Sequence, residues 1–305
     1  MYRINERTFR YYYREHLSGY EPDTFEETLV FEDNLGENLS MDDLGLLDGG
    51  NTVIGNKKTG KLMALILGTK AKDVVKALGH IPLKVRLKVK AVSRDFAGSY
   101  DWAIRQLFWQ AMQIIDRFHV AKLVNEAMQT VRIKYRWQAL DAANKAKKAA
   151  KKEGKRYYAK RHKNGDTYPE LLARSRYLLF KPKSKWKDRQ IERASILFTA
   201  YPEIETAYEL SQGLRAIYEQ EIGVKQARKL IKKWYKKVEE SKIEEMQTSK
   251  ETIKSHEVEV LNFFHNRETN AFAESLNAKL KRFRAMSRGI TDKKFFLYRV
   301  SGYFS

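Results

Sequence analysis

The chain has 305 residues, 43% of them hydrophobic, and its 59 Lys and Arg against 38 Asp and Glu give a formal charge of +21 at pH 7. This length allows one large core or two ordinary ones, and the positive excess favours a protein that lies along phosphate backbones over an enzyme of small molecules. There is no cysteine, which excludes disulfides, Cys-ligated zinc and a cysteine nucleophile.

A membrane-spanning protein is also excluded by the hydropathy pattern. The longest apolar run, around Leu62 to Leu67, is far too short to cross a bilayer, and the first residues contain no apolar stretch typical of a signal peptide. We expect a cytoplasmic, nucleoid-associated protein with double-stranded DNA as its partner. A membrane surface or a merely solvated basic surface are the alternatives that the charge leaves open.

The first predicted elements form a small antiparallel sheet. Residues 1–37 are interpreted as a short N-terminal helical and linker segment, with a helix near Thr8 to Leu17. Three strands are then predicted, joined by tight turns at Gly49–Gly50 and Lys57 to Gly60, which is typical of an antiparallel meander. These strands are Leu39 to Leu47, Thr52 to Asn56 and Lys61 to Leu67.

Alternating helices and strands follow. Lys70 to Leu78 has the spacing of a helix, and Val85 to Ser93 alternates apolar and polar residues as a strand does, ending at Asp95. Tyr100 to Phe108 is predicted to be a helix, and Met112 to Ile115 a short buried strand ending at Asp116. A strand–helix–strand unit favours parallel pairing, so we expect a mixed α/β sheet.

From His119 to about residue 255 the pattern is almost wholly helical. Lys145 to Lys163 holds ten Lys or Arg and one acid, which favours contact with DNA, with a solvated face as the alternative. Asn270 to Arg284 is predicted to be a final amphipathic helix, and Phe295 to Phe304 a short aromatic tail.

Three acids have positions that suit phosphodiester chemistry. Asp42 lies in the first strand of the meander, Asp95 ends the fourth strand and Glu274 lies on the last long helix. Neighbouring strands and a helix packed across them can bring such carboxylates to shared divalent cations, whose preferred ligands are oxygens. Because the chain has 38 acids, spacing alone leaves open that these are ordinary solvated or capping carboxylates.

The last long helix has one polar face. Asn270, Glu274, Asn277 and Lys281 follow one another at helical spacing, while the apolar residues of this helix form a separate stripe. An acid between two amides and a lysine suits a phosphate-facing site. An ordinary surface helix with its apolar face buried is the alternative.

Several blocks of sequence resemble the ISL3 family of insertion-sequence transposases. DRFHV, at 116–120, and the NEA and VR that follow it are similar to one family block. TNAFAESLNAKLK, at 269–281, resembles the block that holds the catalytic glutamate in that family. LSMDD, VKAVSRDF and RSRYLLFK resemble further blocks, and their order also agrees.

This resemblance implies a DDE transposase with an RNase H-like fold: a mixed five-stranded sheet with a large all-helical insertion before the last catalytic helix. The expected divisions are 38–136 for the first part of the core, 137–262 for the insertion and 263–305 for the last helices. The resemblance implies that Asp42, Asp95 and Glu274 are the catalytic metal ligands, with Mg²⁺ or Mn²⁺ as cofactor and two ions bound. Asp43 faces the other side of its strand, and alternation alone does not choose between it and Asp42.

Further residues are expected to support the site or to bind DNA. Asp116 and His119 match a D-x-x-H element of related transposases; a capped helix start with a structural histidine is the alternative. They form a set of secondary active-site residues together with Asn270, Asn277 and Lys281. The expected DNA-binding residues are Lys147, Lys148, Lys151, Lys152, Lys155, Arg156, Lys160 and Arg161.

The resemblance implies cleavage and strand transfer at the ends of a DNA element, with element ends and target as partners and a homo-oligomer on DNA. Family members usually begin with a longer region that reads terminal repeats, and we find only about 38 residues before the first predicted strand. A separately encoded recognition subunit is one expectation from this. The alternatives in function are a truncated, non-catalytic DNA-binding derivative that acts as an inhibitor, and a metal-dependent nuclease of the same fold.

Overall fold

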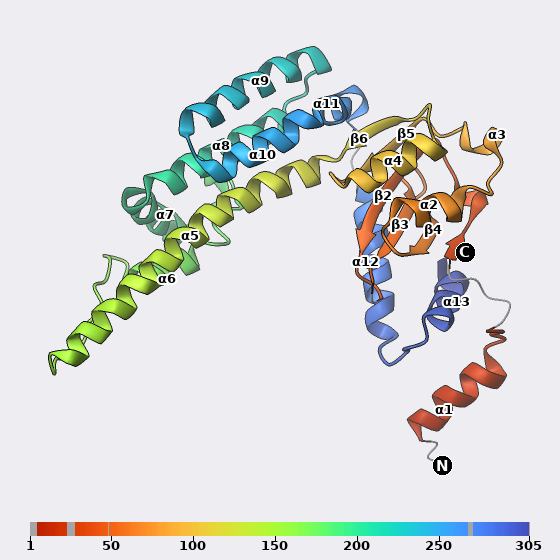
Figure 1. Cartoon of the computed structure of the whole chain (residues 1–305), viewed down its shortest axis with the longest axis horizontal. Helices are drawn as coiled ribbons and strands as arrows, with labels where there is room; N and C mark the ends of the chain where they lie inside the picture. The colour runs from red at the N-terminus through yellow and green to blue at the C-terminus, as the bar shows by residue number, and fades with distance from the viewer. Residues whose placement is uncertain (1–4, 23–27, 48, 268–270, 305) are drawn as a thin grey trace. The chain divides into compact units, whose positions relative to one another are not determined.

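The structure is a computed structural model, and it describes residues 5–22, 28–47, 49–267 and 271–304 (Figure 1). The chain forms two compact units. The sheet unit comprises Met1–Asp116 and Asn266–Ser305, and the helical unit comprises Arg117–His265. The boundary expected between residues 136 and 137 lies inside one continuous helix, and the one expected between 262 and 263 lies inside another.

The described part of the sheet unit contains a six-stranded mixed sheet with strand order β1-β4-β3-β2-β5-β6. The first four strands of this order pair antiparallel, while β5 pairs parallel with β2 and with β6. The strands are β1 (Thr28–Val30), β2 (Asn38–Leu44), β3 (Asn51–Asn56), β4 (Leu62–Leu67), β5 (Ala91–Arg94) and β6 (Met112–Ile115). The meander and the mixed α/β class are confirmed.

The prediction of five strands is wrong, because β1 adds a sixth strand at the edge beside β4. It lies in the segment that we expected to be a helix and a linker. Only Leu29 of its three residues is buried, so the strand is too short to show an alternating pattern. Its pairing with Ala64 to Ile66 of β4 defines it.

A second correction concerns Val85 to Ser93, of which only the end is strand. Leu83–Arg86 forms the short helix α3, and β5 begins at Ala91. The Arg86 guanidinium donates to the carbonyl oxygens of Ile81 at 2.9 Å and Leu107 at 3.1 Å. These two hydrogen bonds hold Leu83–Arg86 in a helical turn, although the four residues alternate between apolar and polar as they would in a strand.

Helices cover both faces of the sheet, as the residue types of the strands require. Leu39 and Met41 of β2 point into a hydrophobic cluster with the helices α2 (Ala71–Leu78) and α4 (Gly98–Leu107). Leu44 belongs to a second cluster with α12 (Ala271–Met286) and α13 (Lys293–Phe304). The expected aromatic tail is therefore a packed helix, with Phe296 and Val300 buried.

The N-terminal segment packs against this last helix. It consists of α1 (Glu6–Tyr12) and a π-helical turn, η1 (Tyr13–Leu17); a 3-10 turn, η2 (Glu32–Asn34), follows β1. The Tyr20 ring lies 5.1 Å from that of Phe295 and 5.3 Å from that of Tyr298, measured between centroids.

The helical unit is built on one long helix, α5, of 36 residues. Its elements are α5 (Arg117–Lys152), α6 (Tyr168–Arg174), η3 (Lys183–Lys185), α7 (Asp188–Ala200), α8 (Pro202–Glu219), α9 (Val224–Ser241), α10 (Glu244–Ser255) and α11 (Glu257–Asn266). Trp234 and Tyr208 are buried in this unit. In the described ranges, no helix has the length and apolar character needed to cross a membrane.

Candidate active site

Asp42 and Asp43 lie near the end of β2 and belong to opposite faces of the sheet. Side chains alternate along a strand, so Asp42 shares the face of Leu44, which α12 covers. The Asn277 amide of α12 donates to Asp42 Oδ2 at 2.8 Å. Asp42 therefore lies beneath the helix that carries Glu274.

Asp43 faces the other way, towards α4. The Tyr100 hydroxyl donates to Asp43 Oδ1, and it lies 3.1 Å from Thr52 Oγ1. Burial, and then the negative charges of Asp95 and Asp42, raise the pKa of Asp43 to about 6. Three carboxylates thus lie close enough to influence one another, and Asp43 is the one held by a buried tyrosine.

The position of Asp95 follows from the parallel pairing of β2 with β5. Ser40 pairs with Ser93, and Asp42 and Asp95 each lie two residues further along the chain, Asp95 just beyond the end of β5. Asp95 follows the last residue of β5, and its Oδ1 accepts a hydrogen bond from the backbone nitrogen of Ala97 at 2.8 Å. The sheet therefore brings the two aspartates to adjacent strand ends.

A buried arginine holds the backbone at this strand end. The Arg94 side chain is fully buried, and its guanidinium donates to the Asp95 carbonyl oxygen at 2.8 Å and to Gln113 Oε1 at 2.7 Å. It thereby joins β5 to β6 directly beside the candidate ligand. Arg94 was not among the predicted site residues, although a charged residue in a buried strand next to Asp95 is a usable signal. Tyr100, which holds Asp43, was not predicted either, because in the sequence it is only one residue of an apolar helix face.

Glu274 lies on α12, three residues before Asn277, so the two side chains share a helix face. Glu274 itself is exposed, as is Lys281. The helix approaches the sheet closely at Gly55 of β3, where an added Cβ would lie 2.8 Å from Leu276 Cδ2. Asn270 lies outside the described residues.

The candidate acids are of the residue type that binds a divalent cation, but they are not gathered around one site. Asp42, Asp95 and Glu274 offer carboxylate oxygens, the ligands that Mg²⁺ prefers, and Asn277 joins the strand of the first to the helix of the third. Within the described ranges, however, no three His, Cys, Asp or Glu side chains lie together closely enough to hold a metal ion. Asp42, Asp95 and Glu274 therefore do not form such a group in the described part of the chain.

The remaining candidates divide between the two units. Asp116 is buried at the end of β6, where its backbone nitrogen donates to the Arg94 carbonyl oxygen at 3.3 Å. His119 belongs to the first turn of α5, in the helical unit, and its ring contacts that of Phe118. This backbone hydrogen bond gives Asp116 a structural contact at the end of β6.

The basic block of the helical unit is exposed. Its eight candidate residues, at the end of α5 and in the segment after it, all have exposed side chains. Lys147 Nζ lies 5.9 Å from the Tyr157 ring centroid, and the Arg156 guanidinium carbon lies 5.6 Å from that of Tyr158. Cations and aromatic rings are therefore interleaved on this surface.

A comparison with known proteins defines the class. A family model described as a transposase, of the DDE type and the ISL3 group, matches residues 39–300. That range includes both aspartates of β2, Asp95 and the whole of α12. The chain belongs to the ISL3 family of DDE transposases. No curated protein and no solved structure matches it.

Proposed function

We propose that this chain catalyses cleavage and strand transfer at the ends of a DNA element, with Asp42, Asp95 and Glu274 as its catalytic triad on an RNase H-like core. The observation that carries the proposal is the hydrogen bond from Asn277 to Asp42. It joins the helix that carries Glu274 to the strand that carries the first aspartate, and that strand pairs with β5, after which Asp95 lies.

The three carboxylates would hold Mg²⁺ or Mn²⁺, as two ions. Such ions, when bound, activate the attacking oxygen and stabilise the leaving oxygen of an in-line displacement. Asn277 holds Asp42 in one orientation, and Arg94 fixes the backbone of Asp95. Asp43 is directed away by Tyr100, so we assign the first ligand to Asp42.

The reaction has two phosphoryl transfers. Water attacks the phosphodiester at the element end, the bond from phosphorus to the 3′ oxygen breaks, and the strand leaves with a 3′-hydroxyl. That hydroxyl then attacks a phosphodiester of target DNA and displaces a second 3′ oxygen. The protein's contribution is position and charge stabilisation, without a covalent enzyme intermediate.

The exposed basic block of the helical unit would bind the DNA backbone. Lysines and arginines there neutralise phosphates without reading sequence. Because an element has two ends that must be joined, we expect two or more copies of the chain on DNA.

The experiment incubates the chain with labelled terminal-repeat DNA and Mg²⁺ or Mn²⁺, and separates cleaved from joined products on a denaturing gel. Cleavage with joining supports the proposal, and cleavage without joining supports a nuclease of the same fold. If the chain binds this DNA but forms neither product, and the Asp95→Asn and Glu274→Gln variants bind it equally well, the result supports a non-catalytic derivative. The dispersed metal ligands in the described residues are the observation that favours this last function.

A further inference from the structure

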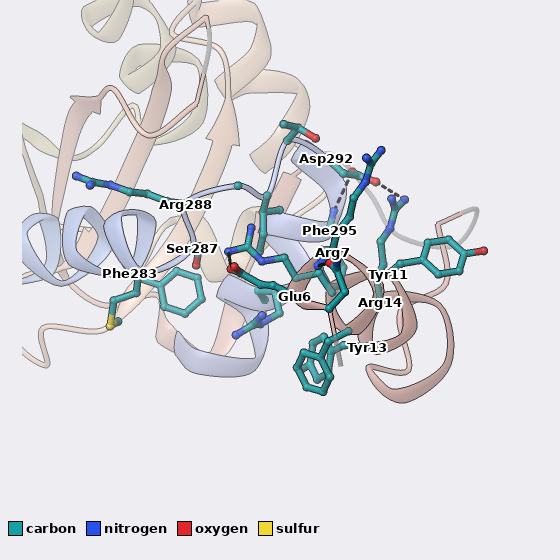
Figure 2. A pocket seen from close by; sticks show the side chains of 18 of the residues that line it. Glu6, Arg7, Tyr11, Tyr13, Arg14, Phe283, Ser287, Arg288, Asp292 and Phe295 are labelled. Carbon is teal, nitrogen blue, oxygen red and sulfur yellow. Dashed lines mark hydrogen bonds and ion pairs between the residues drawn. The ribbon is translucent and has the colours of Figure 1, made fainter. Parts of the chain in front are cut away.

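The sheet unit also contains a groove that neither Asp42 nor Asp95 lines. It lies between the N-terminal helix and the segment that joins α12 to α13 (Figure 2). Its volume is about 1390 Å³. Pockets for one drug-sized molecule typically measure roughly 300–1,000 Å³, so this groove has room for a larger ligand. Neither the family match nor the candidate triad gives it a role.

The groove is strongly basic. Five arginines and two acids line it, and each acid is already paired: Glu6 with Arg10 and Asp292 with Arg14, both at 2.5 Å. The other arginines have no ion pair with an acid in the part of the chain that the structure describes. They are Arg7, Arg288 and Arg299. The groove therefore presents an excess of about three positive charges to a ligand.

Aromatic rings stand among these arginines. Three rings that line the groove are more than half exposed: Phe9 at 52%, Tyr11 at 61% and Tyr303 at 62%. Exposed rings on one basic surface leave flat apolar area available for stacking. The buried Phe283 also lines the groove, with its centroid 5.2 Å from that of Tyr303.

The two walls are joined by specific contacts. Figure 2 shows Arg14 of η1 reaching across to Asp292, and the Arg14 guanidinium carbon also lies 5.8 Å from the Phe295 ring centroid. The Tyr298 hydroxyl donates to the Ser18 carbonyl oxygen. Gly289 has a φ of 94°, and a Cβ there would overlap the Arg10 guanidinium, so glycine leaves the space that this arginine occupies.

We propose that this groove binds unpaired nucleotides of a DNA strand. Arginines that follow the backbone and exposed rings on which bases stack are the two parts of a single-strand binding site. In a duplex the base faces are already stacked on one another, so duplex DNA would use the charges but not the rings. The inference rests on the proposed function only for the source of the strand, since cleavage at an element end releases a terminus that can unpair.

The test measures binding of the full chain to a fluorescein-labelled oligothymidylate and to a labelled duplex, by fluorescence anisotropy. Tyr11→Ala is expected to weaken oligothymidylate binding about tenfold, the scale of one lost stacked base, and to leave duplex binding unchanged. Arg7→Gln with Arg288→Gln is expected to make the dependence of log K on log salt shallower by about 1.4, since each lost single-strand phosphate contact contributes about 0.7. Lys84→Gln with Lys88→Gln, exposed lysines of the same unit outside the groove, is the matched control.

An equal loss in the lysine control would overturn the proposal, because it would show a general effect of net charge. The proposal would also be overturned if the Tyr11→Ala variant bound oligothymidylate as tightly as the unmodified chain does. Tighter binding of polyglutamate than of oligothymidylate would overturn it as well. The outcome is separable from that of the proposed function. Asp42→Asn must keep oligothymidylate binding, and a chain that binds through the groove without cleaving DNA would support this inference while contradicting the catalytic proposal.

Discussion

The sheet unit and the helical unit place their clustered acids in opposite surroundings. In the sheet unit, Asp95 and Asp42 raise the pKa of Asp43, and the described donors to Asp42 and Asp43 are neutral groups. In the helical unit, the buried Asp166 is held by Arg174 and by Arg193. Adjacent carboxylates repel one another and cost stability, which agrees with the role proposed for this pair, whereas Asp166 stabilises its fold.

The largest effect should separate the two neighbouring aspartates. Asp42→Asn is expected to lower the rate of strand cleavage at least about a thousandfold, the scale that follows removal of one member of a catalytic unit. Asp43→Asn keeps the Tyr100 contact and should lower the rate by less than about tenfold. Single-turnover cleavage of labelled DNA measures both. Equal losses, or a larger loss in Asp43→Asn, would move the first ligand to Asp43.

The strands around these acids are largely predictable from the sequence, and the reason is local. The tight turns at 49–50 and 57–60 set the meander without help from the rest of the chain. The edge strand β1 escapes prediction because three residues carry no period, and α3 escapes it because the Arg86 anchor is a tertiary contact. Local pattern defines the elements, and contacts made at a distance alter them.

The same division applies to the candidate site. The helical spacing of Glu274 and Asn277 is enough by itself to place both on one polar face. Which aspartate that face meets depends on the packing of α12 over Gly55, which no spacing in the sequence encodes. The Tyr100 contact to Asp43 joins residues 57 positions apart and is likewise beyond prediction from local pattern.

The second prediction concerns the basic surface of the helical unit. Replacing Lys147, Lys148, Lys151 and Lys152 by glutamine is expected to weaken duplex binding on the order of 100-fold at about 0.1 M salt, and to make the salt dependence shallower by up to about 3.6. The exposed lysines Lys229, Lys232, Lys233 and Lys236 of α9 provide a control with the same change of charge. Titrations at several salt concentrations measure the slopes. Identical slopes in the two quadruple variants would show that the block is only a solvated face.

The third prediction concerns Asp166, whose side chain is 1% exposed. Burial raises the pKa of this carboxyl, but hydrogen bonds and charges from Arg193 and Arg174 outweigh that and hold the pKa below its ordinary value. Asp166→Asn should lower the free energy of unfolding by about 2–3 kcal/mol near neutral pH. Urea unfolding followed by circular dichroism measures it, with the exposed Asp141→Asn as control.

The sign of the pH dependence follows from the depressed pKa. A carboxyl whose folded pKa lies below its unfolded value stabilises the protein above the unfolded pKa, about 3.9, and that contribution is lost as pH falls through the folded value. The difference between the unmodified chain and Asp166→Asn should therefore be constant from neutral pH to about 5 and shrink below about 4. A difference that grows in acid would contradict the ion-pair explanation.

The smallest effect tests whether Asn277 acts on the reaction through Asp42. Asn277→Leu keeps the size of the side chain and removes the 2.8 Å hydrogen bond, so we expect cleavage to slow about tenfold, the lower end of what loss of a ligand's support costs. Because the role is one of position, the concentration of Mn²⁺ needed for half-maximal rate should rise, and the unfolding midpoint should change little. Lys279→Leu, an exposed position on the same helix, separates this effect from a general change in α12. If Asn277→Leu lowered only stability and left the Mn²⁺ dependence as it was, the hydrogen bond would be a packing contact, and the helix would have to bring Glu274 to the aspartates by other contacts.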